Sequence, residues 1–364
     1  MKSLLLLFLL TGLVGKPLPQ WKAGELDIHA INSARGECTF FILPDGTTMV
    51  ADAGDTGDVS PKKYSKVAPK PDGTTCPAKV YADYMRHFLP AVSRDSIDCF
   101  ILTHYHSDHM NGVTDLYSML PFRRILDRSY PDYSDAVRTG GTAKDYSFYS
   151  DFVSEKVAHE GLKAERFDVG SDSQLGLVHK PDRKFRITNY AAGGYAWDGR
   201  QSVDCHATRE NAMSCAFLVQ YGPFEYWTSG DNNWKELIEC TSKAIGHRIE
   251  AMKCLHHMSN PEQVKIENDI LHPQVIITQS FFVRKIQPHQ KVIEAIGDGQ
   301  DLFFTNIDGS LVTSFPDIYS KCKAIGGHFV IRVSKGGKKF YVYQLDDTSS
   351  DYTVKAVYGP YKSN

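Results

Sequence analysis

The stretch Thr103-His104-Tyr105-His106-Ser107-Asp108-His109 decides how this sequence folds and which chemistry it carries. It follows the largely apolar run 97–102, which is typical of a buried strand, so the histidines and the aspartate fall where that strand ends. Zinc, manganese and iron accept imidazole and carboxylate ligands. The first two imidazoles alternate and point the same way, whereas Asp108-His109 turns the chain towards a second ion. The spacing therefore predicts two metal ions rather than one.

Composition describes an ordinary globular protein. The chain has 364 residues, of which 42% are hydrophobic and 23% charged, enough for a full core in one large or two ordinary domains. The formal net charge is −2, so no global basic field favours a nucleic-acid backbone. Nucleic acid is therefore a partner that the charge does not indicate.

The first twenty residues predict a secretory leader. Met1-Lys2-Ser3 is a short basic region, and 4–15 is a leucine-rich run that two prolines end. Its dozen apolar residues are too few to span a bilayer, which needs roughly 20. We expect a signal peptide at 1–20, a mature domain at 21–364 without an integral membrane segment, and a secreted or periplasmic location.

The eight cysteines are scattered without a C-x-x-C pair. An exported protein permits disulfides, but the spacing predicts no connectivity. Cys99, Cys215 and Cys254 lie in apolar, strand-like runs and are expected to be small buried hydrophobes. Better disulfide candidates lie in looser surroundings: Cys76, Cys205, Cys240 and Cys322.

Strand and helix patterns alternate along the chain. Helical spacing predicts helices over 79–89 and 233–243. Apolar alternation and turn residues predict strands at 26–30, 39–43, 48–51, 214–221, 224–228, 249–255, 275–278, 302–305, 328–333 and 339–345. This is an α/β pattern, and it predicts a four-layer αββα sandwich of two mixed sheets with helices outside.

Residues 121–209 differ from the rest, because they are polar and rich in tyrosine, with a helix expected over 146–159. We interpret them as an insertion or cap over the site, since long elaborated segments are commonly functional lids. The equally weighted alternative is that the aromatic residues form a satellite core.

Three more segments place polar residues at predicted strand ends. Asp52 follows strand 48–51, Asp231 follows 224–228, and the His256-His257 pair follows 249–255. Each alone is compatible with ordinary turn chemistry. Their order around the histidine loop favours a single metal site over a solvated or adventitious histidine cluster.

Together these segments resemble the metallo-β-lactamase superfamily, in particular the branch of ComEC-type DNA-uptake metallohydrolases and phosphorylcholine esterases. The run 104–109 resembles the dinuclear motif, 255–259 resembles His-His-Gly-Ser, and 210–214 resembles Glu-Asn-x-x-Ser. The resemblance covers nearly all of 25–345. It implies the metallo-β-lactamase fold with an elaborated insertion.

The resemblance implies roles for individual residues. We expect His257 rather than His256 to be the ligand, because the family ligand directly precedes a glycine, although Met258 replaces that glycine and leaves the choice open. The implied metal ligands are His104, His106, Asp108, His109, Asp231 and His257. Catalytic roles are implied for Asp108, for the bridging Asp231, and for His256 as a proton donor or oxyanion-stabilising group.

Other groups are expected around the ligands. Asp52 would orient the metal loop, Asn211 and Ser214 would contact a ligand, the substrate or only their own strand, and Tyr105 is a weaker alternative for assisting the leaving group. The third superfamily motif usually supplies a histidine. His206 is the only imidazole near 210–214, and we expect it to be a loop residue rather than a ligand.

The implied activity is that of a secreted dinuclear hydrolase that uses a metal-bridging hydroxide. Its cofactors would be two divalent ions, by default zinc, with manganese or iron as alternatives. The absent third-motif histidine favours a phosphodiester or another small-molecule substrate over lactone or β-lactam rings. A non-catalytic metal-binding protein is the alternative from a different class, and the complete ligand set argues against it.

Overall fold

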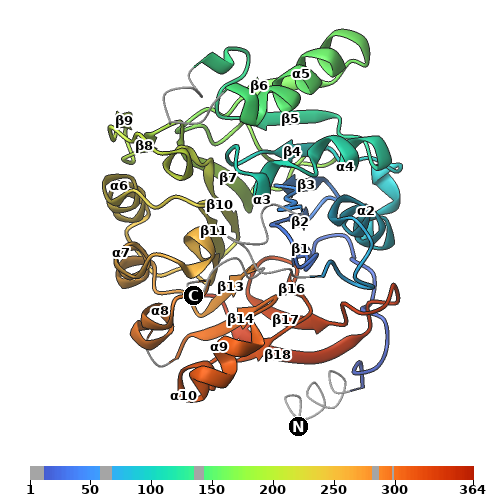
Figure 1. The fold of residues 1–364 in the computed structure, drawn as a ribbon, viewed down its shortest axis with the longest axis vertical. Helices are drawn as coiled ribbons and strands as arrows, with labels where there is room; N and C mark the ends of the chain where they lie inside the picture. Colours follow the sequence, from blue (N-terminus) through green and yellow to red (C-terminus); the bar gives the residue numbers. More distant parts are fainter. Residues whose placement is uncertain (1–11, 58–67, 135–142, 281–286, 297–298) are drawn as a thin grey trace.

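The computed structural model describes residues 12–57, 68–134, 143–280, 287–296 and 299–364. They form two nine-stranded mixed sheets that pack face to face (Figure 1). The first sheet has the order β18 (Val354–Lys362), β17 (Lys339–Leu345), β16 (His328–Val333), β1 (Leu26–Ala30), β2 (Thr39–Ile42), β3 (Thr48–Ala51), β4 (Cys99–Ile101), β5 (Arg124–Asp127) and β6 (Lys163–Arg166). Its strands run antiparallel from β18 to β3 and parallel from β3 to β6.

The second sheet also combines a parallel half with an antiparallel half. Its order is β15 (Ala324–Ile325), β14 (Asp301–Phe304), β13 (Val275–Thr278), β12 (Ala251–Lys253), β11 (Phe224–Thr228), β10 (Ala216–Tyr221), β7 (Phe185–Ala192), β8 (Tyr195–Trp197) and β9 (Ser202–Asp204). The strands are parallel from β15 to β11 and antiparallel from β11 to β9. Each sheet therefore has a parallel half whose strand ends can share one edge.

Alternation along the strands builds three cores and four layers. On β2, Phe41 packs between the sheets against Phe217, with ring centroids 6.0 Å apart, whereas its neighbour Phe40 belongs to the outer core. The first sheet's outer core includes residues of α2 (Pro77–Phe88), α4 (Val113–Met119) and α5 (Ala143–His159). The second sheet's outer core includes residues of α6 (Lys235–Ile245), α7 (Pro261–Leu271), α8 (Gln290–Ala295), α9 (Gly309–Ser314) and α10 (Pro316–Tyr319). The predicted αββα sandwich is confirmed.

Residues 121–209 differ from the expected cap, because most of their regular structure belongs to the two sheets. β5 and β6 extend the first sheet, and β7 to β9 extend the second. Helix α5 lies over the first sheet, where Tyr146 and Tyr149 join its outer core. The segment therefore links the two halves of the domain, and many of its aromatic residues fill the core.

The predicted leader is described only from residue 12 onwards, so its first eleven residues lie outside the described part of the chain. Gly15 donates a backbone hydrogen bond to Val354 at 2.8 Å, and Leu18 is buried. In the described parts of the chain, every helix is too short or too polar to span a bilayer.

The cysteines follow the predicted division in part. Cys99, Cys215 and Cys254 are buried, as predicted. All eight cysteines are free thiols, including the four disulfide candidates. Cys205 and Cys240 influence the pKa of each other's thiols, which places two of those four candidates near each other.

Candidate metal centre

The candidate site forms where parallel strands end together. Ala51 on β3 pairs with Ile101 on β4, and on the other sheet Trp227 pairs with Met252 and Lys253 with Ile277. The carboxyl ends of parallel neighbours meet at one edge, which is where open α/β sheets usually bind ligands. The loops after β3, β4, β11 and β12 carry the residues that the sequence singled out.

Two histidines converge on one carboxylate oxygen. Nε2 of His109 and Nε2 of His257 each lie 3.2 Å from Oδ2 of Asp231. Asp108 is close as well, with Oδ2 at 3.5 Å from Nε2 of His257 and 3.9 Å from Nε2 of His109. Ligand atoms of Glu37, His109, Asp231 and His257 all lie within 4.8 Å of one another. This buried group can hold a metal ion.

The other two predicted ligands form an adjacent pair. Nε2 of His104 lies 3.1 Å from Nδ1 of His106, and the His104 and His109 rings are 4.2 Å apart. Two nitrogens bound to one tetrahedral zinc ion at about 2.0–2.1 Å would be roughly 3.3 Å apart. The structure therefore brings all six predicted ligands to one place, as a histidine pair beside the group around Asp231.

Electrostatics at the site favours added positive charge. Burial would lower the pKa of His257, but the Asp231, Asp108 and Glu37 carboxylates outweigh burial and raise it to about 9. Burial would also lower the pKa of His109, but the Asp231, Asp52 and Asp108 carboxylates outweigh it and raise that pKa. Nε2 of His109 is buried beside Asp231 without making a hydrogen bond. Divalent ions would satisfy these groups in place of protons, so the residues present fit metal ions.

Asp52 lies where an orienting role requires it. Its Oδ2 accepts a hydrogen bond from Nδ1 of His109 at 2.7 Å, and its two oxygens accept from the Thr103 backbone and hydroxyl at 2.8 Å each. The Thr103 hydroxyl thus donates to Asp52 and can accept from Nδ1 of His104 at 3.1 Å. These bonds place protons on the Nδ1 atoms, which leaves Nε2 of both histidines available to a metal.

Gly54 lets the loop that carries Asp52 pack closely against the loops that carry Glu37 and Asp108. A Cβ on Gly54 would lie 1.6 Å from the backbone oxygen of Asp108. In its place, Gly54 donates to the Glu37 backbone oxygen and Glu37 donates to that of Asp108, both at 2.9 Å. The Asp-x-Gly motif therefore serves close packing of three loops as well as hydrogen bonding.

His257 and His256 point to different surroundings. His257 is fully buried and faces Asp231, whereas Nε2 of His256 is 3.8 Å from that carboxylate and its side chain is 21% exposed. Nδ1 of His256 bonds to Oδ1 of Asn260, and Nε2 bonds to Nδ2 of Asn211 at 3.0 Å. With this pattern Nε2 is an acceptor, so the predicted proton-donor role requires His256 to take up a proton first.

The backbone at His256, His257 and Met258 adopts an unusual conformation. The φ angles of His256, His257 and Met258 are 43°, 50° and 61°, in the left-handed region that favours glycine. Each non-glycine residue there costs roughly 1–2 kcal/mol. Met258 thus adopts a conformation that a glycine would adopt freely, and strain of this kind is concentrated at functional sites.

Ser214 contacts the site, and His206 does not. The Ser214 hydroxyl lies 3.3 Å from Nδ1 of His104 and accepts a hydrogen bond from the Asp231 backbone at 3.1 Å. The side chain of His206 is 87% exposed and lies 3.5 Å from Asp204. The structure thus agrees with the interpretation of His206 as a loop residue.

The prediction that Tyr105 could assist the leaving group is wrong, because its side chain points away from the ligands. Its hydroxyl donates to Asp127 at 3.3 Å, and the Arg128 guanidinium lies 4.4 Å from its ring centroid. An alternating pattern cannot tell which side a residue between two ligands faces. Tyr105 therefore anchors the metal loop, and it has no direct access to a leaving group.

Two residues of the site were missed by the sequence analysis. Glu37 belongs to the potential ligand group, and Lys253 lies 2.9 Å from its carboxylate and 3.4 Å from Oδ1 of Asp231. A lysine within the apolar strand 249–255 was the available signal, since buried lysines are rare unless paired. For Glu37, the only available signal in the sequence was its position directly after a turn.

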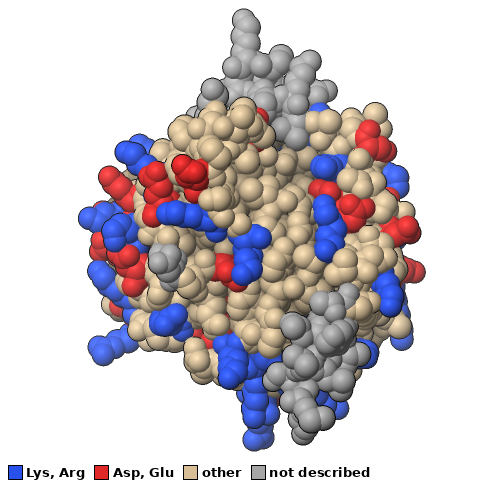
Figure 2. All heavy atoms as spheres, turned by 90° about the horizontal axis from the view of Figure 1, so that it is seen from below, with Lys and Arg blue, Asp and Glu red and all other residues tan. Residues whose placement is uncertain are grey.

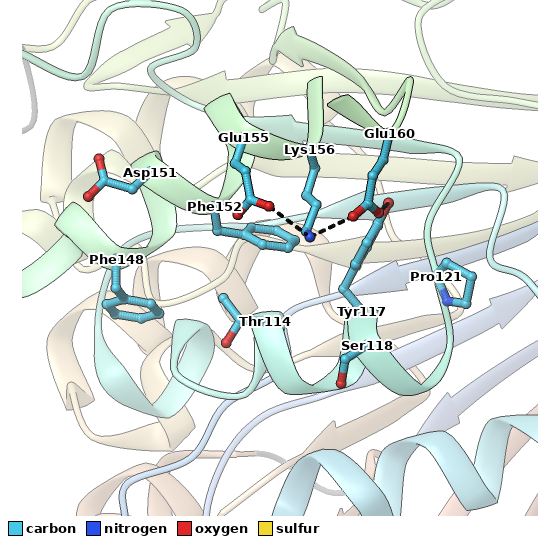
Figure 3. Close-up of a pocket in the computed structure, with 10 residues that line it drawn as sticks. All are labelled: Thr114, Tyr117, Ser118, Pro121, Phe148, Asp151, Phe152, Glu155, Lys156 and Glu160. Carbon is cyan, nitrogen blue, oxygen red and sulfur yellow. Dashed lines mark hydrogen bonds and ion pairs between the residues drawn. The ribbon is translucent and has the colours of Figure 1, made fainter. Parts of the chain in front are cut away.

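The hollow drawn in Figure 3 lies apart from the ligands. It has a volume of about 820 Å³ between α4 and α5, and none of the residues lining it is a predicted ligand. Lys156 extends across it, 2.7 Å from Glu160 and 3.3 Å from Glu155, with its ammonium 5.9 Å from the Tyr117 ring centroid. Its one cationic side chain is therefore already paired.

Comparisons with known proteins find distant likenesses to solved structures. No family model and no curated protein matches the sequence. Similar solved structures include CmlA, a diiron β-hydroxylase from Streptomyces venezuelae (14% identity, TM-score 0.42, 87% of this chain and 55% of that one). Yeast PDE1 (11%, 0.39, 84% and 99%) and ST1585, a metallo-β-lactamase superfamily protein from Sulfolobus tokodaii (13%, 0.32, 83% and 95%), are others. The chain thus spans about half the length of CmlA.

The fold and the site establish less than a family. The chain is an α/β protein with two mixed sheets packed face to face, and it has a buried His/Asp/Glu cluster as a metal-site candidate. Similarity at these TM-scores identifies no activity.

Proposed function

We propose that this protein is a dinuclear metal-dependent hydrolase of the phosphodiesterase type, related to the ComEC and phosphorylcholine-esterase branch. The convergence of His109 and His257 on Oδ2 of Asp231, beside the His104–His106 pair, carries this proposal. A merely structural histidine cluster would not need Asp52, Asp108 and Asp231 beside it, because the repulsion of these three carboxylates has to be balanced by positive charge.

The chain's own residues have distinct roles in this proposal. Bound divalent ions, zinc or else manganese or iron, would supply a hydroxide at neutral pH by lowering the pKa of water from 15.7 to about 7. Asp231 and Asp108 would hold the ions, and Asp52 would orient His109. His256, at the exposed side of the site, would act on the substrate, and Asn211 would fix the orientation of its ring.

Two observations support a phosphodiester substrate. The segment at the third motif carries Asn211 and Ser214 while His206 is exposed, so the site differs from the pattern expected for lactam and lactone hydrolases. The formal net charge is −2, and basic and acidic side chains are interspersed on the face in Figure 2, so charge does not indicate a nucleic-acid backbone as the diester. We further infer export, from the leader predicted at 1–20.

The test is metal analysis joined to a substrate panel. Purified protein loaded with zinc or manganese is assayed with bis-p-nitrophenyl phosphate, p-nitrophenyl phosphate, a lactone and a β-lactam. We expect two ions per chain and hydrolysis of the diester above the other three. Hydrolysis of the lactam alone, or two bound ions without any turnover, would overturn the phosphodiesterase proposal.

A matched pair of variants separates site chemistry from general damage. Asp231→Asn removes the shared carboxylate and should abolish diester hydrolysis. Asp115→Asn makes the same chemical change on the exposed surface of α4 and should leave hydrolysis unchanged. Wild-type rates of diester hydrolysis in both variants would show that Asp231 is not part of the site.

A further inference from the structure

Lys253 is a buried cation whose ammonium lies at the metal site. It is the last residue of β12 and is 1% exposed. Nζ donates to the Gly230 backbone oxygen at 2.6 Å and lies 2.9 Å from Oε2 of Glu37 and 3.4 Å from Oδ1 of Asp231. Burying a lysine is costly unless it is paired, so these three oxygens define its place.

The two oxygens of Asp231 have different partners. Oδ2 faces Nε2 of His109 and Nε2 of His257 at 3.2 Å each. Oδ1 faces Lys253 instead. The Asp231 backbone nitrogen is also fixed, by its hydrogen bond to Ser214 at 3.1 Å. The carboxylate is thus held in one orientation, with one oxygen towards the ligands and one towards the ammonium.

Glu37 has the geometry of a ligand but already has a counter-ion. Its carboxylate is 3% exposed, and Lys253 is closer to it than His257, whose Nδ1 lies 3.4 Å away. Nδ1 of His257 also bonds to the Gln279 backbone oxygen at 2.8 Å. The ammonium is therefore the main balance for the Glu37 charge.

We propose that Lys253 is a positioning residue that sets the ligand set of the metal centre. By holding Oδ1 of Asp231 it leaves Oδ2 alone to the metal ions, and by pairing with Glu37 it keeps that carboxylate off them. This inference rests on the proposed dinuclear centre. Without Lys253, both Oδ1 and the Glu37 carboxylate would turn to the nearest remaining cations, which are the metal ions.

The experiment compares manganese-loaded variants by electron paramagnetic resonance and by the rate of manganese release to excess chelator. Lys253→Met removes the ammonium. Lys265→Met is the matched control, since Lys265 is an exposed lysine on α7 paired with Asp269. We expect two ions in the wild type, an altered spectrum in Lys253→Met, and about 10- to 100-fold slower release, because the ions gain carboxylate oxygens and lose a neighbouring positive charge; this is the range by which partners of metal ligands change affinity. Lys265→Met should match the wild type.

A second variant covers the case in which Lys253→Met does not fold. Lys253→Met/Glu37→Gln removes both charges of the buried pair, so it avoids an unbalanced carboxylate. It should still show an altered spectrum, because Oδ1 of Asp231 is released. An unchanged spectrum and release rate in this folded double variant would overturn the role of Lys253. If wild-type protein binds two manganese ions and hydrolyses the diester in that case, the proposed function stands and only this inference fails.

Discussion

Two buried carboxylates at strand ends, Asp231 and Asp127, lie in the same domain with opposite surroundings. Asp127 accepts from the backbones of Ser129 and Tyr130 at 2.7 and 2.8 Å. It also accepts from three phenol hydroxyls at 2.8 to 3.3 Å, those of Tyr105, Tyr133 and Tyr149. Asp231 faces imidazole nitrogens and one ammonium instead. One carboxylate is satisfied by neutral donors, and the other lies among groups that ligate metals.

The different partners of Asp127 and Asp231 indicate a structural role for the first carboxylate and a metal-binding role for the second. Neutral donors balance a buried carboxylate without any further ion, so Asp127 can serve as a fixed anchor. Tyr105 connects the two regions, because it lies between two predicted ligands and bonds to Asp127. The Asp127 cluster therefore supports the loop that the Asp231 cluster uses.

The largest expected effect is on the Asp231 side. Asp231→Asn keeps the size of the side chain but removes the charge that both His109 and His257 face. We expect loss of at least one bound ion and of diester hydrolysis, with a circular dichroism spectrum like that of the wild type. Metal content at or near the wild-type value would show that the two carboxylates do not differ as described.

Asp127→Asn should damage stability and spare the metal ions. The amide nitrogen would face donors that the carboxylate accepted, and a buried hydrogen bond to a charged group contributes about 1.5–3 kcal/mol. We expect the free energy of unfolding in urea to fall by about 3 kcal/mol, with metal content unchanged. Loss of the metal ions without loss of stability would place Asp127 in the site.

Metal affinity should depend on pH through the Asp231 cluster. In the metal-free protein the pKa of His257 is raised to about 9, because Asp231 and Asp108 outweigh its burial. Below that pH a metal ion must displace the proton, so affinity should fall as pH falls, by about tenfold per pH unit for one proton. Competition titrations at pH 6.5, 7.5 and 8.5 would check this, and a pH-independent affinity would contradict it.

The Asp127 cluster should not contribute to that pH dependence. Burial, with Asp127 beside it, raises the pKa of Tyr149 far above the range of the titrations. Tyr149→Phe should therefore leave the dependence of metal affinity on pH unchanged. A changed slope in this variant would mean that the two clusters titrate together.

A smaller loss of stability than that of Asp127→Asn is expected at Tyr105. Tyr105→Phe removes its 3.3 Å hydrogen bond to Asp127 and keeps the ring against Arg128. We expect the free energy of unfolding to fall by about 1 kcal/mol. The rate of diester hydrolysis should not change, because the hydroxyl points away from the ligands. A fall in turnover of a hundredfold or more would restore Tyr105 as a group that assists the leaving group.

Much of the fold follows from local patterns in the sequence. The strands predicted at 26–30, 224–228 and 275–278 coincide with β1, β11 and β13, because apolar alternation and turn residues delimit them. The strands within 121–209 were not predicted. β8 and β9 have three residues each, and β6 is a partly exposed edge strand, so their patterns are short and weak.

The site was predictable where ligand types cluster in the sequence. His104 to His109, Asp231 and His257 follow strands whose ends meet, and the structure brings them together. Glu37 lies in the loop before β2 of one sheet and Lys253 ends β12 of the other, so only the packing of the two sheets shows that they pair. The direction of Tyr105 likewise depends on α5 and Asp127, which lie far along the chain.

In the proposed centre, Asp231 joins two sets of ligands into one dinuclear site. Elemental analysis of wild-type protein dialysed against zinc or manganese counts the metal ions bound per chain. We expect two ions per folded chain. One ion or none, in protein that circular dichroism shows to be folded, would contradict it.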